Sequence, residues 1–175
     1  SYGAIAAIRM AMHAMKQKHP EYAPLLLTME NVKDEDWENN WKQFYKPMEI
    51  GSRLLVVPEW EEAADPERVK LVLNPGLTFG TGSHDTTQLC MMALEDVVKP
   101  GDKLLDMGTG SGILAIAAAM LGADVQTIVD IDENCLRNAH ENAEKNHVTI
   151  GRGLCGDALR DAKLAGDSGA GYDVI

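Results

Sequence analysis

The sequence predicts an α/β fold in which helices cover a parallel sheet, and three observations support this prediction. Strand-length apolar runs alternate with runs of helical length over residues 69–175. A glycine-rich turn at residues 108–112 joins one such strand to the next helix. Asp130 follows the next strand, close to the distance from the turn, roughly 20 residues, at which nucleotide-binding folds place a ribose-binding acid.

The composition is that of a globular protein, and it argues against several classes of function. With 175 residues the chain can form one sizeable core and perhaps a smaller partner domain. Its net charge of −11 disfavours direct binding to nucleic acid and would attract a basic partner. No apolar run approaches the roughly 20 residues of a membrane-spanning helix. The three cysteines are Cys90, Cys135 and Cys155, and they lack the spacing of a zinc site. Scattered cysteines suggest free thiols in a reducing compartment. We therefore expect a cytoplasmic protein that binds neither a metal nor a membrane.

The first 58 residues are predicted to form the end of a small domain and a linker. Apolar residues at spacings of three and four predict a helix over residues 4–18. Residues 25–29 are predicted to form a strand, and Asp34 to cap a helix that ends before Pro47. After a short strand at 53–57, the polar segment 59–68 is the predicted entry to a second domain, which covers residues 59–175.

A long loop without periodicity separates the first strand of the second domain from its first helix. The strand is predicted at 69–73, the loop at 74–87 and the helix at 88–98, with Asp85 as its cap. Long structureless loops in compact domains are usually functional. The N-terminus of this helix would then point at whatever the loop holds.

The central unit is a strand at 104–107, the glycine turn, a helix at 113–121 and a strand at 124–129. In the turn, Gly108, Gly110 and Gly112 allow the backbone to approach a ligand closely. The turn is not the usual dinucleotide pattern, because Ile113 occupies the position of its third glycine. Asp106, just before the turn, would also repel a pyrophosphate.

These residues favour a nucleoside that carries a positive charge instead of phosphate. S-adenosylmethionine has a sulfonium and an ammonium, which suit Asp106, and ribose hydroxyls, which suit Asp130. Two alternatives stay open: a nicotinamide dinucleotide, as in an oxidoreductase, or glycines that serve helix packing alone.

The remaining elements extend the sheet. Asp132 is predicted to cap a helix over 133–146, followed by a third strand at 152–156 and by Asp157, whose carboxylate would accept from the adenine amino group. Residues 165–171 are predicted to be a loop, and a fourth strand begins at residue 172 as the other neighbour of strand 104–107. The sheet would then lack its second half, so we expect that the natural protein continues beyond residue 175.

Three stretches resemble the bacterial methyltransferases of large-subunit ribosomal protein eleven, the PrmA family. Residues 35–47, with Glu35-Asp36-Trp37-Glu38-Asn39-Asn40-Trp41-Lys42 and Tyr45-Lys46-Pro47, resemble the segment that joins that family's two domains. Residues 74–87, beginning Asn74-Pro75-Gly76-Leu77-Thr78-Phe79-Gly80, resemble its signature loop. Residues 105–118 resemble its cofactor turn, with Thr109 where many members have cysteine.

The resemblance implies a Rossmann-like class I methyltransferase sheet, here incomplete at its C-terminal side, preceded by the end of a small α+β domain that holds the ribosomal protein. It implies transfer of a methyl group from S-adenosylmethionine to lysine or other amino groups of that basic protein. A cofactor-binding fragment without turnover is the alternative, because the family's Asn-Ile motif after the fourth strand would lie beyond Ile175. The sequence indicates no general base. The predicted cofactor-binding residues are Phe79, Gly80, Thr86, Thr87, Asp106, Gly108, Gly110, Gly112, Asp130, Ile131 and Asp157.

Overall fold

The structure, a computed structural model, describes residues 2–22, 24, 26, 45–74 and 82–175. The chain divides into two compact units, residues 1–41 and 42–175. This division precedes the predicted boundary after residue 58, because the strands on either side of that boundary pair with each other in one sheet. The role of residues 1–58 as the remnant of a substrate-binding domain stays a proposal.

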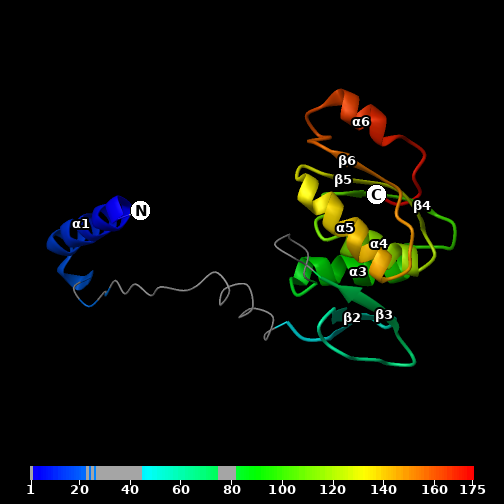
Figure 1. Cartoon of the computed structure of the whole chain (residues 1–175), viewed down its shortest axis with the longest axis horizontal. Coiled ribbons are helices and arrows are strands. Elements are labelled where there is room, and N and C mark those ends of the chain that lie inside the picture. Colours follow the sequence, from blue (N-terminus) through cyan, green and yellow to red (C-terminus); the bar gives the residue numbers. More distant parts are fainter. Residues whose placement is uncertain (1, 23, 25, 27–44, 75–81) are drawn as a thin grey trace. The chain divides into compact units, whose positions relative to one another are not determined.

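In the first unit, helix α1 spans Tyr2–Lys18 and the short 3₁₀ helix η1 spans Pro20–Tyr22 (Figure 1). The prediction of a helix over residues 4–18 is confirmed. The predicted strand at 25–29 and the helix after Asp34 lie largely outside the described residues. None of the described helices is both long and apolar enough to cross a membrane.

The second unit begins with a small sheet of three strands in the order β1-β2-β3. β1 (Met48–Ile50) runs antiparallel to β2 (Leu54–Pro58), which pairs in parallel with β3 (Val69–Leu73). Every residue of β2 is buried. The sheet therefore belongs to the core of this unit.

A second, fully parallel sheet has the order β4-β5-β6 and carries the predicted glycine turn. Its strands are β4 (Lys103–Met107), β5 (Asp124–Asp130) and β6 (Arg152–Cys155). On the free side of β4, the Leu105 amide donates to the Val174 carbonyl at 3.0 Å, in a parallel bridge between Leu104 and Val174. The three predicted strands at 104–107, 124–129 and 152–156 are thus confirmed. The predicted fourth strand from residue 172 is present only as this single parallel bridge beside β4.

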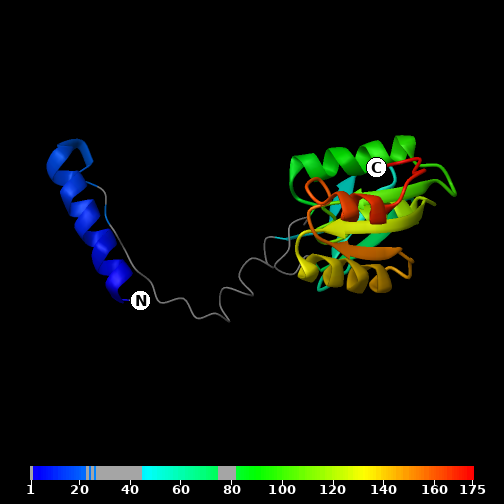
Figure 2. The same ribbon diagram turned by 90° about the horizontal axis from the view of Figure 1, so that it is seen from above.

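Three helices lie between the two sheets, as Figure 1 shows, and Figure 2 shows the same elements from above. They are α3 (Asp85–Val97), α4 (Ile113–Met120) and α5 (Glu133–Lys145). α4 contacts β3 on one side and β4 and β5 on the other, so one apolar core joins the two sheets through the helices. A smaller apolar cluster, with Leu105 and Val129, lies on the opposite face of the second sheet, where Leu164 of α6 (Ala162–Ser168) packs.

Two local predictions were wrong, and side-chain capping explains both. Helix α3 is capped by His84, whose ring accepts from the Thr86 amide at 3.3 Å, so Asp85 is already its first residue. Residues 165–168, predicted as loop, belong to α6. The carboxylate of Asp161 starts that helix by accepting from the amides of Lys163 and Leu164.

One carboxylate of α3 fixes the turn between β1 and β2. Glu95 accepts hydrogen bonds from the amides of Ser52 (2.8 Å), Arg53 (2.9 Å) and Leu54 (3.1 Å), and from the Ser52 hydroxyl (3.0 Å). Burial raises the pKa of Glu95, but these hydrogen bonds lower it more, and the net pKa lies below its ordinary value. The small sheet is therefore attached to the helical layer through an ionised side chain.

Candidate cofactor site

The glycine turn after β4 is held against the end of β5. The amides of Gly108 and Thr109 both donate to the Val129 carbonyl, at 2.8 and 3.1 Å. Gly108 has a φ of +78°, and nothing lies within 4 Å of the position that its Cβ would occupy. The backbone at Gly108 is therefore open to a ligand in a conformation that favours glycine.

Asp130, the last residue of β5, orders this turn and keeps acceptor capacity. One carboxylate oxygen accepts from the Gly110 amide at 2.9 Å, and the other accepts from the Asp132 amide at 3.0 Å. A carboxylate offers about four lone-pair sites. The Cys135 thiol also hydrogen-bonds to Asp130. One of these sites therefore remains for a hydroxyl group of a ribose.

A cavity of about 370 Å³ opens at the carboxyl ends of the parallel strands. Four predicted cofactor residues line it, namely Gly108, Asp130, Ile131 and Asp157. Its other lining residues are Met107, Val129, Gly156, Ala158 and Leu159. The described residues that line it carry two carboxylates and no basic side chain, so the lining suits a ligand without phosphate.

The two outer members of this set differ in character. Ile131 is 77% exposed and offers an apolar surface beside the cavity, as a purine ring would use. Asp157 is exposed, accepts from the Leu159 amide at 3.1 Å and pairs with Arg160 at 3.4 Å. Asp157 thus has a partner on each oxygen, as Asp130 has, and keeps lone pairs for a further donor.

Asp106 lies beneath the turn and outside this cavity. Its side chain accepts from the Thr109 hydroxyl at 2.8 Å, and the residue is 8% exposed. Burial raises the pKa of Asp106 and the charge of Asp130 adds to this, whereas hydrogen bonds from Thr109 and from the Ala115 amide oppose it. A cation close to Asp106 would relieve this cost of burial.

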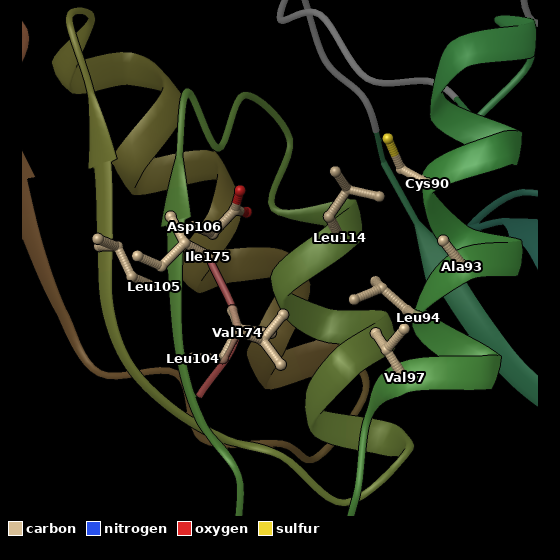
Figure 3. A pocket seen from close by; sticks show the side chains of 10 residues that line it. All are labelled: Cys90, Ala93, Leu94, Val97, Leu104, Leu105, Asp106, Leu114, Val174 and Ile175. Carbon is tan, nitrogen blue, oxygen red and sulfur yellow. The ribbon is translucent and has the colours of Figure 1, made fainter. Parts of the chain in front are cut away.

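Figure 3 shows Asp106 at the edge of a second cavity of about 230 Å³, between β4 and α3. Asp106 is its one charged lining residue among the described part of the chain. The other lining residues are Cys90, Ala93, Leu94, Val97, Leu104, Leu105, Leu114, Val174 and Ile175. Asp106 therefore lines this apolar cavity and does not line the cavity at the carboxyl ends of the parallel strands.

The remaining predicted residues have other surroundings. At Gly112 a Cβ would lie 2.7 Å from the Ala139 Cβ, so this glycine permits close packing of the turn on α5. Gly110 contributes its amide to Asp130. Thr86 and Thr87 begin α3 and line neither cavity; Thr87 is buried. Phe79 and Gly80 lie outside the described residues.

The sequence analysis did not identify Gly156, which lines the cavity, or the Cys135 thiol, which is a neighbour of Asp130. Gly156 directly precedes Asp157, and a glycine after a strand was the available signal. Cys135 has a pKa raised to about 11 by burial first, and then by the charges of Asp130 and Asp132 and a hydrogen bond to Asp130. Asp130 thereby also keeps a neighbouring thiol protonated.

The donor set fits S-adenosylmethionine. Asp130 keeps an acceptor site for the ribose, Gly108 leaves the backbone open, and the buried carboxyl group of Asp106 beneath the turn suits a cationic amino-acid tail. A diphosphate would meet two carboxylates instead. Fold and cavity together define a nucleoside-binding α/β domain of the methyltransferase class.

The chain belongs to the ribosomal protein L11 methyltransferase (PrmA) family, whose model matches residues 2–164. This is a family of S-adenosylmethionine-dependent enzymes. It is 51% identical over 128 residues to a "Ribosomal protein L11 methyltransferase" of Chloroflexus aurantiacus, a match covering 70% of this chain and 39% of the relative. It is 47% identical over 137 residues to one of Burkholderia vietnamiensis, covering 77% of this chain and 46% of the relative. The chain thus spans less than half the length of these relatives.

A solved structure agrees with this assignment. The crystal structure of a ribosomal protein L11 methylase from Lactobacillus delbrueckii subsp. bulgaricus superposes with a TM-score of 0.60 at 37% identity. The superposition covers 67% of this chain and 61% of the crystallised one. The predicted family and the mixed α/β fold with a parallel sheet are confirmed.

Proposed function

We propose that this chain binds S-adenosylmethionine in the cavity at the ends of β4, β5 and β6. We further propose that it forms part of an enzyme that methylates amino groups of ribosomal protein L11. The relatives' names supply the substrate. The observation that carries the cofactor proposal is Asp130, whose oxygens accept from the amides of Gly110 and Asp132 and keep room for a ribose hydroxyl.

The residues of this chain would act mainly by binding and orientation. S-adenosylmethionine supplies a methyl group on a sulfonium, which is a good leaving group. A bond forms between the substrate nitrogen and the methyl carbon while the carbon–sulfur bond breaks, its electron pair stays on sulfur, and the nitrogen's proton passes to solvent. Asp130 and Gly108 would hold the nucleoside, and Asp106 would stabilise the positive amino-acid tail through the turn above it.

The net charge of −11 fits a basic protein substrate. A substrate lysine has an ordinary pKa of about 10.4, so its amine must be neutral before it attacks. Desolvation lowers the pKa of an amine, and the apolar cavity of Figure 3 lies beside Asp106. We assign no general base, because an amine that enters neutral requires none.

Calorimetric titration of the chain with S-adenosylhomocysteine and, separately, with NAD tests the cofactor proposal. We expect the first to bind with 1:1 stoichiometry and the second not to bind. Binding of NAD with equal or higher affinity would refute the proposal and favour the oxidoreductase alternative.

Transfer of a labelled methyl group to purified ribosomal protein L11 tests the reaction. A chain that binds S-adenosylhomocysteine and gives no transfer, while a full-length relative gives transfer, would establish the alternative of a cofactor-binding fragment. Transfer by the chain alone would show that its residues suffice for turnover.

A further inference from the structure

Asn142 of α5 and Asn146, which caps the C-terminal end of α5, cover the free edge of β3. The Asn146 carboxamide accepts from the Val72 amide (2.7 Å) and donates to the Val72 carbonyl (2.6 Å). The Asn142 carboxamide makes the same pair with Asn74, accepting from its amide (3.0 Å) and donating to its carbonyl (2.9 Å). Each side chain therefore imitates the peptide group of a neighbouring strand.

The geometry of helix and strand explains the spacing. Four residues of an α-helix rise about 6 Å, and two residues of a strand rise about 6.7 Å. Asn142 and Asn146 are four residues apart, and Val72 and Asn74 are two residues apart. The two carboxamides thus meet successive outward-facing peptide groups of β3, while the Leu73 carbonyl, facing the other way, accepts from Glu59.

Asn142 makes a contact with the glycine turn that Asn146 does not make. Its amide nitrogen also donates to the carbonyl of Ser111, in the glycine turn, at 2.9 Å. Asn142 and Ser111 are both 0% exposed. One buried carboxamide therefore joins the end of β3, where the signature stretch starts with Asn74, to the turn that borders the cofactor cavity.

We propose that Asn142 is a positioning residue for cofactor binding, because it fixes the glycine turn relative to the end of β3. The proposal rests on the proposed function. Asn142 does not line the cavity, so it would act through Ser111 and the turn. Its orientation is set by its partners: a carboxamide turned by 180° would direct its oxygen at two carbonyls and its nitrogen at an amide.

The matched variants are Asn142→Asp and Asn146→Asp, which make the same change within α5 and at its C-terminal cap. Asn142→Asp directs a carboxylate oxygen at the carbonyls of Asn74 and Ser111. Asn146→Asp directs one at the carbonyls of Val72 and Asn142, and Asn146 has no hydrogen bond to the glycine turn. We expect the first to weaken S-adenosylhomocysteine binding at pH 8 by about tenfold or more, and the second by less than about threefold. Circular dichroism checks that both are folded, and Asn142→Ser, which keeps one donor, replaces Asn142→Asp if that variant does not fold.

Two further readouts separate positioning from a loss of overall stability. Protonation of the carboxylate introduced by Asn142→Asp would restore a donor, so we expect the affinity ratio of the two variants to approach one as the pH falls toward 5. Without ligand, exchange of the Gly110 amide is expected to accelerate in Asn142→Asp and to stay unchanged in Asn146→Asp. Wild-type affinity in folded Asn142→Asp and Asn142→Ser, or equal losses in the matched pair, would overturn the positioning role. A wild-type chain that binds no S-adenosylhomocysteine would instead refute the proposed function, and this inference with it.

Discussion

Replacing Asp130 with asparagine should weaken cofactor binding more than any other single loss of charge at the ends of the parallel strands. The carboxylate accepts from the amides of Gly110 and Asp132, hydrogen-bonds with the Cys135 thiol, and keeps an acceptor site for a ribose hydroxyl. In Asp130→Asn, one of the carboxylate oxygens becomes a donor that faces an amide, and the charge is lost. Hydrogen bonds to charged groups contribute about 1.5–3 kcal/mol each, so we expect a loss of about 2–4 kcal/mol, which is about 30- to 700-fold in affinity.

Calorimetric titration with S-adenosylhomocysteine measures this loss, and Asp132→Asn is the matched control. Asp132 caps α5 by accepting from the Asn134 amide at 2.8 Å, and its side chain does not line the cavity. Asparagine caps a helix about as well as aspartate, so this control removes an equal charge from a neighbouring position at little cost. Affinity of Asp130→Asn within about twofold of wild type, or an equal loss in Asp132→Asn, would show that Asp130 does not hold the ribose.

Three further predictions concern stability and reactivity. Glu95→Gln should cost about 1–3 kcal/mol at pH 7. The pKa of Glu95 in the folded state is lowered from 4.5, so its contribution to the free energy of unfolding is present above pH 4.5 and is lost as the pH falls below that value. Urea unfolding of wild type and Glu95→Gln at pH 7 and near pH 4 measures this loss. A difference between the two proteins that is the same at both pH values would contradict the prediction. Cys135, with a pKa of about 11, should react with iodoacetamide at pH 8 about 100-fold more slowly than an ordinary thiol; mass spectrometry follows this reaction, and Asp130→Asn should accelerate it. Gly112→Ala should cost about 2–4 kcal/mol in urea unfolding, from its positive φ and the contact with α5. Gly108→Ala should cost less stability, about 1–2 kcal/mol, and its main effect should be weaker S-adenosylhomocysteine binding. Equal losses of stability in the two glycine variants would contradict this distinction.

The central unit was predictable because its signals are local. An apolar strand, a turn with alternating glycines, an alanine-rich helix and a terminal aspartate follow each other within residues 104–130, and the structure has β4, α4 and β5 there. The ends of helices were less predictable. His84 and Asp85 are adjacent, and the side chain of either residue could cap the N-terminus of α3. His84 caps α3 because its ring reaches the Thr86 amide, which depends on a rotamer that the sequence does not specify.

The separate roles of the glycines and carboxylates could not be predicted from spacing. Gly108 and Gly112 look equivalent along the chain, but one borders a cavity and the other packs on Ala139 of α5, which is distant in sequence. Asp106 and Asp130 both lie near the carboxyl ends of their strands, yet the side chain of Asp106 lies under the turn and accepts from Thr109. Asn142 gave no signal, because polar residues on a helix usually face solvent and its partner Asn74 lies 68 residues away.

Among the contacts that hold the glycine turn, two come from side chains of different kinds on opposite sides of it, and they bear on how the turn would bind a ligand. Asp130 holds the Gly110 amide from the cavity side, and Asn142 holds the Ser111 carbonyl from the buried side. With both contacts formed within the protein itself, binding need not order the turn, and the conformational cost of association falls. Loss of either contact should therefore weaken binding, but for different reasons. Loss of Asp130 removes contacts with the ligand. Loss of Asn142 leaves those contacts possible, but it lowers the population of the turn conformation that can form them. The pH-dependent recovery expected for Asn142→Asp should for that reason have no counterpart in Asp130→Asn, whose side chain does not titrate.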